Sequence, residues 1–232
     1  MKKLSIVIPV YNEKNTILEI LKRIDAAALP LEKEIILVDD CSTDGTREIL
    51  KTLPAEKYKV IYQDKNRGKG AAVRRGFKET GGDLIIIQDA DLEYDPSEYG
   101  KLIKPILDGK ADVVYGSRLA GSEARRVLYF WHYLGNRGFT FLSNIFSNLN
   151  LSDMETGYKV FSRAALDKIL PRLVSNRFGL EPEITMLVGK NKMRVYEVGI
   201  TYSGRTYLEG KKINWRDGLA AIWHIVRFGL RR

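Results

Sequence analysis

The first half of the chain alternates strand-like and helix-like segments, and this alternation restricts the fold more than any other feature. Short β-branched runs end at polar residues, and apolar residues at helical spacing follow most of them. The expected strands are 4–10, 34–38, 59–62, 84–87 and 113–115, with helices at 16–28, 46–53 and 68–80. The run 84–87 is apolar throughout, which predicts a strand covered on both faces. This alternation predicts an α/β domain with a mostly parallel sheet.

The second half has a different pattern. Asp95 and Pro96 predict a further helix start, with a capping carboxylate and a proline in the first turn. Beyond residue 116 we expect aromatic-rich and basic amphipathic helices at 127–149 and 214–232, and strands at 157–161 and 194–202. Because no repeat or long linker interrupts the sequence, we expect one domain over 1–232, with functional halves 1–115 and 116–232.

Composition sets limits on location and partners. The 232 residues are enough for a sizeable core, and the single Cys41 allows no intrachain disulfide, which fits a reducing compartment. No apolar run reaches 18 residues, so we expect no transmembrane span, and the run 4–9 is too short for a signal peptide. A net charge of +9 indicates an anionic partner, either nucleic acid, a phosphorylated small molecule or a membrane surface.

Acidic loops follow three of the expected strands. They are Tyr11-Asn12-Glu13, Asp39-Asp40 and Asp89-Ala90-Asp91. Parallel strands bring such loops to one sheet edge, where ligands bind in open α/β folds. Clustered carboxylates need a cation or hydrogen-bond donors, unless they are simply solvated. The spacing of Asp89 and Asp91 suits Mg²⁺ or Mn²⁺, which bind oxygen ligands together with substrate phosphates.

A glycine-rich segment, Asn66-Arg67-Gly68-Lys69-Gly70, precedes an expected helix. Glycines permit close backbone approach, and a helix N-terminus attracts phosphate. The spacing matches neither the P-loop nor the dinucleotide-binding motif, which argues against an ATPase or a dehydrogenase. The alternative is an ordinary turn that contains glycine.

Together these motifs resemble family 2 glycosyltransferases with the GT-A fold, a Rossmann-like three-layer sandwich. The matching segments are 5–13, 38–46, 66–70 and 89–91, in order over about half the chain. The resemblance implies that a nucleotide-sugar donor is bound by Pro9, Tyr11, Glu13, Asp40, Lys69, Asp89 and Ala90. It also implies that Asp89 and Asp91 hold the Mg²⁺ or Mn²⁺ ion, Asp91 acting in catalysis.

Within that family, the chain looks most like the dolichyl-phosphate mannose and glucose synthases. The segments that carry this likeness are 91–96, 116–118, 153–161 and Arg205 with 210–212. The resemblance implies that Glu93 is a third metal ligand and that Arg118 binds the acceptor phosphate. Arg205 and Lys211 would close over the diphosphate. Which residue binds the acceptor phosphate together with Arg118 is left open, and there are three candidates: Arg126, His132 and Arg137.

The resemblance implies an inverting single displacement from a donor of the UDP-glucose or GDP-mannose type. The Gln-x-x-Arg-Trp signature of processive synthases is absent, so we expect transfer of one hexose per acceptor. A hydroxyl acceptor would require a carboxylate base, and Glu181-Pro182-Glu183 stands at the family's position, with Glu183 our candidate. A polyprenyl phosphate, dolichyl or undecaprenyl, is already ionised and requires none. Glu181 and Glu183 would then contact the sugar or cap the helix.

The two late helices favour a lipid-phosphate acceptor. Aromatic residues such as Trp131 and Trp223, with Arg227 and the C-terminal arginines, are typical of helices that lie on an anionic membrane surface. The alternative is that these apolar stripes pack as core. We therefore expect a cytoplasmic protein, peripheral on the cytoplasmic face of a membrane, and leave open a separate membrane partner that receives the lipid-linked sugar.

Two other functions compete with lipid glycosylation. One is a family 2 glycosyltransferase that acts on a soluble or glycan hydroxyl. The more distant one is a sugar-phosphate nucleotidyltransferase, although the lysine-rich signature of those enzymes near the first strand is absent. Nucleic acid is not an expected partner, because acids surround the ligand edge and no RNA-binding signature appears.

Overall fold

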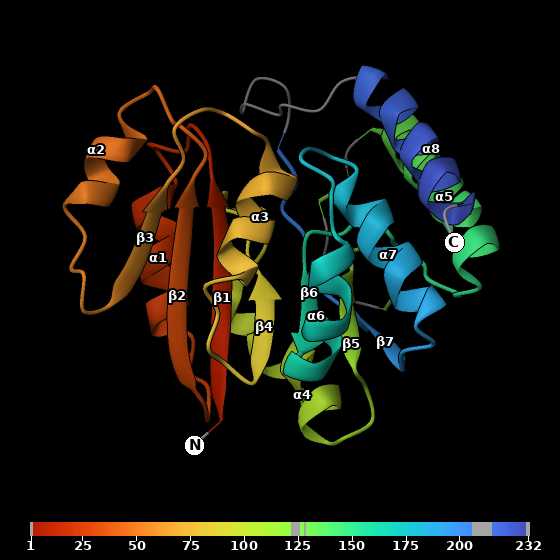
Figure 1. Cartoon of the computed structure of the whole chain (residues 1–232), viewed down its shortest axis with the longest axis horizontal. Helices are drawn as coiled ribbons and strands as arrows, with labels where there is room; N and C mark the ends of the chain where they lie inside the picture. Colours follow the sequence, from red (N-terminus) through yellow and green to blue (C-terminus); the bar gives the residue numbers. More distant parts are fainter. Residues whose placement is uncertain (1, 122–125, 128, 206–214, 231–232) are drawn as a thin grey trace.

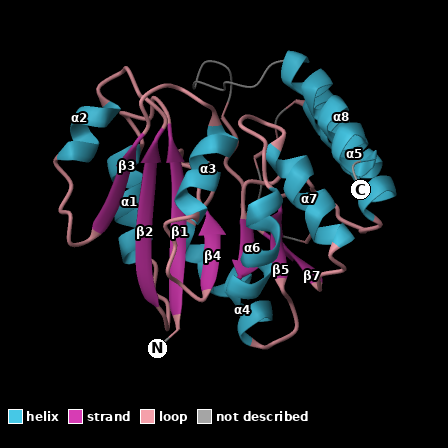
Figure 2. Cartoon of the chain, viewed as in Figure 1, coloured by secondary structure: helices cyan, strands magenta, loops and turns pink. Residues whose placement is uncertain are grey.

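The computed structural model contains one seven-stranded sheet with helices on both faces (Figure 1, Figure 2). The structure describes residues 2–121, 126–127, 129–205 and 215–230. The strands are β1 (Lys3–Val10), β2 (Glu32–Asp39), β3 (Tyr58–Tyr62), β4 (Leu84–Ile87), β5 (Val113–Ser117), β6 (Lys159–Ser162) and β7 (Val195–Gly199). The helices are α1 (Ile17–Ala26), α2 (Thr46–Lys51), α3 (Lys69–Phe77), α4 (Tyr99–Leu107), α5 (Phe130–Ser147), α6 (Arg163–Ile169), α7 (Leu180–Lys190) and α8 (Trp215–Leu230), with short 3-10 turns η1 (Pro96–Glu98) and η2 (Leu170–Arg172).

The strand order is β3-β2-β1-β4-β6-β5-β7, and every neighbouring pair is parallel except the two that involve β6. The predicted mostly parallel α/β sheet is therefore confirmed. The antiparallel position of β6 was not predicted, because it depends on pairing between distant segments. Phe161 of β6 stands opposite Ile85 on one side and Val113 on the other. The carboxyl ends of the other six strands still lie at one edge.

The buried strand β4 shows how the sheet is covered. Leu84 and Ile86 belong to the core cluster that α1 and α4 share. Ile85 and Ile87 belong to the cluster under α3, α6 and α7. Because side chains alternate between the faces of a strand, the continuous apolar run fills both cores, as predicted.

Tyrosines in the core fix the loop that follows β4. The predicted helix start is confirmed: Asp95 accepts a hydrogen bond from the backbone of Ser97, with a proline between them, and α4 begins immediately after η1. Tyr99 then donates to Gln88 Oε1 at 2.6 Å, and Tyr158 donates to the same oxygen at 2.7 Å. Gln88 is fully buried and is held by both tyrosines, so the loop that follows it begins at a fixed position.

Helices α5, α7 and α8 pack on one another beside the β5–β7 end of the sheet (Figure 1). Gly189 of α7 allows the close approach to α5, because a Cβ atom there would collide with the carbonyl of Ser147. Ile225 and Phe228 place one side of α8 in the core.

Candidate active site

The loops after β1, β2 and β4 meet at one edge of the sheet. The amide of Asp40 donates to the carbonyl of Val10 at 2.8 Å, and that of Gln88 donates to the carbonyl of Val7 at 3.0 Å. The Tyr11 side chain stands partly exposed beside them. The convergence expected from the sequence is therefore present in the backbone.

One guanidinium group contacts three of the predicted acids. Arg205, which follows β7, places Nη2 2.6 Å from Asp91 Oδ2 and Nη1 3.7 Å from Glu13 Oε2. Its Nε is 3.3 Å and its backbone N–H 2.9 Å from Glu93 Oε1. Burial opposes the charge, but Asp91 and Glu13 outweigh it and raise the pKa of Arg205. A residue more than 100 positions downstream of these acids thus neutralises part of their charge.

Lys69 supplies a second cation from the glycine-rich segment. Its Nζ lies 2.8 Å from Asp89 Oδ1 and 3.2 Å from Glu181 Oε1. Burial disfavours the ammonium charge, yet these two carboxylates raise the pKa of Lys69 above its usual value. Gly68 has a φ of +94° and no room for a Cβ beside the carbonyl of Asn176. The glycines therefore allow the start of α3 to pack closely against the backbone of residues 175–177.

Acids nevertheless outnumber cations here. Burial first, and then the charges of Asp89 and Glu93, raise the pKa of Asp91 to about 7, although Arg205 acts in the opposite direction. Such a shift means that the ionised carboxylates are incompletely compensated by the protein. The arrangement therefore favours a further positive group.

The donor set fits a divalent metal in its chemistry. Asp89 and Asp91 present carboxylate oxygens, and Mg²⁺ is usually bound by one or two carboxylates together with phosphate and water. Glu93 accepts hydrogen bonds from Tyr202 Oη at 2.9 Å and from Arg205. Asp91 likewise pairs with Arg205, at 2.6 Å, so these contacts do not set Glu93 apart from the other predicted ligands. Among the described residues there is no group of three or more acidic, histidine or cysteine side chains arranged to hold a metal. Asp89 and Asp91 therefore stay the predicted metal ligands, with Glu93 the predicted third.

Asp40 organises the loop in front of α3. It is 2% exposed, and it accepts from the backbone amides of Arg67 and Gly68 and from Gln63 Nε2, at 2.7 to 3.0 Å. Burial, opposed by these amides, raises the pKa of Asp40. A direct contact with the nucleotide base stays a prediction. Pro9, half-buried at the end of β1, and Ala90, buried beside Asp89, line the same edge.

Arg118, the predicted phosphate ligand, forms a bidentate pair with Asp153. Both nitrogen–oxygen distances are 2.7 Å, and Asp153 is fully buried. The guanidinium also lies over the ring of Tyr202, 5.1 Å from its centre. Burial opposes ionisation of Asp153, but Arg118 lowers its pKa overall. Asn136 adds a hydrogen bond to Asp153 at 3.2 Å.

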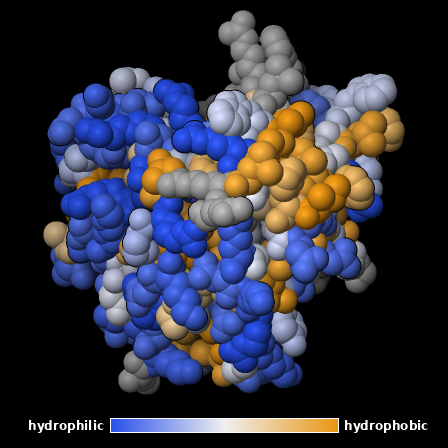
Figure 3. Space-filling model, turned by 45° about the vertical axis from the view of Figure 1, so that its right-hand side comes forward, coloured by the Kyte–Doolittle hydropathy of each residue, from blue (hydrophilic) through white to orange (hydrophobic). Residues whose placement is uncertain are grey.

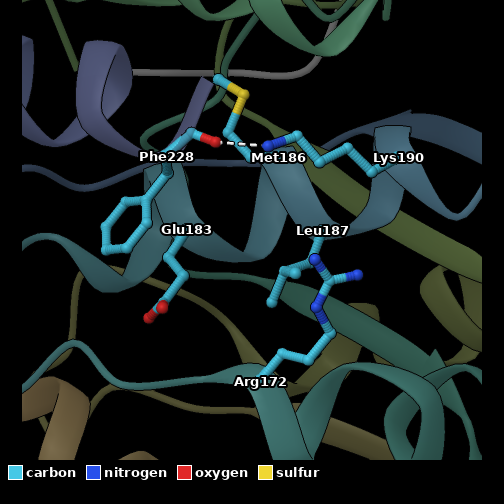
Figure 4. A pocket seen from close by; sticks show the side chains of 6 residues that line it. All are labelled: Arg172, Glu183, Met186, Leu187, Lys190 and Phe228. Atoms are coloured by element: carbon cyan, nitrogen blue, oxygen red, sulfur yellow. Dashed lines mark hydrogen bonds between the residues drawn. The ribbon is translucent and has the colours of Figure 1, made fainter. Parts of the chain in front are cut away.

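Glu183, predicted as a candidate base, has a structural position. It is 1% exposed, and its two oxygens accept from the backbone amides of Val174 and Ser175 at 2.8 to 3.1 Å. Figure 4 shows it in a hollow that Met186, Phe228 and other residues line between α7 and α8, with space of about 20 Å³, roughly one water molecule. This geometry favours the alternative of an anchoring role.

The remaining phosphate-ligand candidates lie just before α5 and on it. Arg126 donates to the carbonyl of Gly204 at 3.2 Å, next to Arg205. His132 packs on Tyr129, and Arg137 is exposed on α5. The predicted diphosphate ligand Lys211 lies outside the described residues.

Sequence reasoning missed several site residues in the second half of the chain. Asp153, Glu155 and Lys159 lie close together in the segment that precedes and begins β6, and Tyr202 joins Glu93 to Arg118. The first three stand in the motif 153–161 that carried part of the resemblance. The excess of charge in a segment that leads into a buried strand was the available signal.

Comparison with known proteins identifies the family and the fold. The family model described as "Glycosyl transferase family 2" matches residues 5–170. A dolichol-phosphate mannosyltransferase of Pyrococcus furiosus is 32% identical over 219 residues, covering 91% of this chain and 60% of that protein. This chain therefore spans about three fifths of that relative's length.

A UDP-N-acetylglucosamine–dolichyl-phosphate N-acetylglucosaminyltransferase of Methanococcus voltae is 28% identical, covering 97% of this chain and 95% of that protein. Among solved structures, glucosyl-3-phosphoglycerate synthase of Mycobacterium tuberculosis, crystallised with Mn²⁺, UDP and phosphoglyceric acid, superimposes with a TM-score of 0.75 at 18% identity, covering 100% of this chain and 80% of that one. This likeness shows the fold, which is the GT-A fold expected from the sequence.

Proposed function

From the premise that this chain belongs to glycosyl transferase family 2 and resembles its dolichyl-phosphate sugar transferases, we propose that it transfers one hexose from a nucleotide sugar to a polyprenyl phosphate, with inversion. The donor is of the UDP-glucose or GDP-mannose type. The observation that carries the proposal is the set of carboxylates at the strand ends, held by Arg205 and Lys69.

The donor half of the reaction follows from these charges. Lys69 and Arg205 contact Asp89 and Asp91 directly, so a diphosphate bound there would meet two cations as well as the metal. When bound, Mg²⁺ or Mn²⁺ supplies positive charge that stabilises the leaving nucleoside diphosphate. The role of the chain itself is to hold the anomeric carbon in line for a single displacement.

The acceptor half favours a phosphate. Its oxygen is already ionised at neutral pH, so no base is needed to create the nucleophile. Glu183, our candidate base for a hydroxyl acceptor, has both oxygens bonded to backbone amides. Arg118 has a fixed guanidinium plane, which suits the recognition of an anionic group.

A hydroxyl acceptor is the second candidate, and one observation favours it. Oε2 of Glu181 is buried and has no hydrogen-bond partner among the described residues. A carboxylate in that state is able to accept a proton from a sugar hydroxyl if it faces one. The two candidate reactions therefore differ in the role of Glu181, which would act as a general base only with a hydroxyl acceptor.

The outer side of the α5–α8 pair supports a lipid acceptor. Six of its large apolar side chains are more than half exposed, and Figure 3 shows a broad hydrophobic area on this part of the molecule. The most exposed are Phe130, Trp131, Phe141, Ile145, Trp223 and Leu230. No helix in the described ranges is long and apolar enough to cross a bilayer. We therefore propose that this surface lies on the membrane that holds the prenyl phosphate.

Basic residues on the same helices suit an anionic bilayer. Arg227 stacks on Trp223 with its guanidinium 5.4 Å from the ring centre, and Arg137 is exposed on α5. The chain should therefore sediment with anionic liposomes and be released at high salt, because salt screens surface charge. If the chain fails to sediment with anionic liposomes at low salt as well as at high salt, the result would count against a peripheral location on the cytoplasmic face.

The test of the proposed function is a panel of UDP- and GDP-sugars with Mn²⁺ or Mg²⁺, assayed with and without prenyl phosphate. Release of nucleoside diphosphate that depends on prenyl phosphate is the expected result. Release that depends on a soluble glycan would support the hydroxyl acceptor instead. Formation of pyrophosphate from a nucleoside triphosphate and a sugar phosphate would identify a nucleotidyltransferase.

A further inference from the structure

Glu197 of β7 holds two consecutive backbone amides in the segment between α5 and β6. Its Oε1 accepts from the amides of Ser152 and Asp153 at 2.8 and 3.2 Å and from the Ser152 hydroxyl at 3.2 Å. Its Oε2 accepts from the Ser152 amide at 3.0 Å. Ser152 and Asp153 belong to neither a helix nor a strand, so their amides need side-chain partners. Glu197 is that partner for both.

The segment that Glu197 holds carries the partner of Arg118. Asp153 accepts from Nε and Nη2 of Arg118, both at 2.7 Å, and from the Arg118 backbone amide at 3.0 Å. Asp153 is fully buried, and a side chain in a close-packed interior moves little without its backbone. The position of the Asp153 backbone, which Glu197 fixes, therefore sets the plane of the Arg118 guanidinium.

Two hydroxyl groups give Glu197 a second connection to the loop that carries Arg118. The Ser152 hydroxyl donates its only proton to the Glu197 carboxylate. In the 2.6 Å hydrogen bond between Ser152 and Ser117, the Ser117 hydroxyl is therefore the donor. The Ser117 oxygen in turn accepts from the amides of residues 119–120, at 3.1 and 2.9 Å. The carboxylate thereby orders hydrogen bonds on both sides of Arg118 in the sequence.

Helix α5 also supports the segment, but with neutral groups. Asn136 donates to the Asp153 carboxylate at 3.2 Å, and the Met154 amide donates to Thr140 Oγ1 at 3.1 Å. Hydrogen bonds to an ionised acceptor are roughly twice as strong as those between neutral groups. Among the contacts described for this segment, those of Glu197 therefore contribute most to holding its backbone.

We propose that Glu197 is a positioning residue for the acceptor, which holds the Arg118 guanidinium in the plane that meets the acceptor phosphate. This inference rests on the proposed function, because it takes Arg118 as the phosphate ligand. Arginine recognises a phosphate through N–H groups in a fixed planar fork, so the orientation of the group matters as well as its charge. Loss of Glu197 should therefore weaken the use of the acceptor and spare the binding of the donor.

Kinetics with prenyl phosphate and calorimetry with UDP and GDP, both with Mn²⁺, separate the two substrates. In Glu197→Ala we expect the KM for prenyl phosphate to rise about tenfold or more, as for loss of a charged hydrogen bond, with unchanged affinity for the diphosphate. Normal diphosphate binding also shows that the variant is folded. Glu197→Gln keeps an oxygen that can take the place of Oε1, which makes three of the four contacts, and should recover most of the acceptor affinity.

Glu34→Ala is the matched control. Glu34 of β2 also accepts from a serine hydroxyl, that of Ser5, and from a backbone amide, that of Gly81, but near the amino end of the sheet. Its loss should leave the KM for prenyl phosphate unchanged. Ser152→Ala breaks only the hydroxyl connection and should raise this KM less than Glu197→Ala does. It tests the connection even if Glu197→Ala does not fold.

The Nε proton of Arg118 gives a second measurement, which requires no turnover. Because Nε donates to Asp153 at 2.7 Å, exchange of this proton with solvent requires that the pair opens. In NMR of arginine-labelled protein, with Arg118→Lys to identify the signal, we expect exchange in Glu197→Ala to be about tenfold or more faster than in the wild type. Glu34→Ala should leave the exchange rate unchanged.

The two measurements distinguish failure of this inference from failure of the proposed function. An unchanged KM for prenyl phosphate or unchanged Arg118 exchange in Glu197→Ala, or an equal rise in KM in Glu34→Ala, would overturn the positioning role and leave the proposed function intact. A wild-type chain that transfers no sugar to prenyl phosphate would overturn the proposed function and the acceptor role of Glu197 with it. The exchange rate would then still decide whether Glu197 holds Arg118.

Discussion

Two arginines at the same edge of the sheet have opposite electrostatic surroundings. Arg118, after β5, gives two nitrogens to the single fully buried carboxylate of Asp153. Arg205, after β7, is divided among three acids at 2.6 to 3.7 Å. The first pair is balanced in charge, while the second group has more acids than cations. We infer that the balanced pair fixes the orientation of the Arg118 guanidinium, whereas the unbalanced group marks the place where a cation binds.

The largest effect should come from breaking the balanced pair. Asp153→Ala leaves the Arg118 charge buried without its partner, which typically costs about 3–5 kcal/mol of folding free energy. Urea denaturation measures the change directly. A loss below about 1 kcal/mol would show that the pair is not an anchor.

The unbalanced group should respond differently. Asp91→Ala removes a proposed metal ligand and one of several repelling acids, so we expect at least about a hundredfold loss of turnover without loss of stability. Enzyme assay and thermal melting of the same sample test both halves of this statement. Glu19→Ala on the exposed side of α1 is a control that should change neither, because its partner Arg23 is also exposed. Full turnover of Asp91→Ala, or of the wild type in chelator, would contradict the assignment.

Asp40 should show an intermediate effect confined to the donor. We predict that its carboxylate hydrogen-bonds the nucleotide base, so Asp40→Ala removes a charged hydrogen bond to the donor, worth roughly 1.5–3 kcal/mol. Calorimetry with the nucleoside diphosphate should give affinity weaker by about ten- to a hundredfold. Unchanged nucleotide affinity would remove Asp40 from the binding site.

The smallest effect is a difference in pH dependence between acids with and without a dedicated cation. Asp153 has a lowered pKa, so its contribution to stability is present above about pH 4 and is lost as the pH falls through its folded pKa. Glu155 has its pKa raised to about 7 by burial and by Glu181, so ionisation destabilises the folded state increasingly between about pH 4 and pH 7.

Urea denaturation between pH 4 and pH 7 tests this difference. Glu155→Gln should gain stability relative to the wild type as the pH rises, whereas the deficit of Asp153→Asn should stay constant over this range and shrink only below about pH 4. Parallel pH curves for the two variants would contradict the distinction between the acids.

The first half of the site was predictable because its residues follow from local rules. A parallel sheet brings the ends of its strands together, so Glu13, Asp40, Asp89 and Asp91 were found by their positions after apolar runs. The sheet itself was predicted from alternation, apart from the antiparallel β6.

The second half of the site was less accessible, because its side chains are defined by partners distant in sequence. The pairing of Arg118 with Asp153 spans 35 residues and that of Arg205 with Asp91 spans 114. Glu183 shows the same limit. Its position in the sequence suggested catalysis, whereas in the structure it anchors the backbone by accepting hydrogen bonds from the amides of Val174 and Ser175. Helix periodicity likewise left open whether α5 and α8 are core or surface, and the structure shows that they are both.

Transfer of a radiolabelled hexose from UDP-glucose or GDP-mannose to prenyl phosphate, with Mn²⁺ or Mg²⁺, is the most direct test of the central claim. The account predicts an organic-soluble, acid-labile glycosyl phosphate that is absent with Asp91→Ala. Arg118→Ala should impair the use of the acceptor more than the binding of the donor. Label that appears only in water-soluble glycans would contradict the prenyl phosphate acceptor.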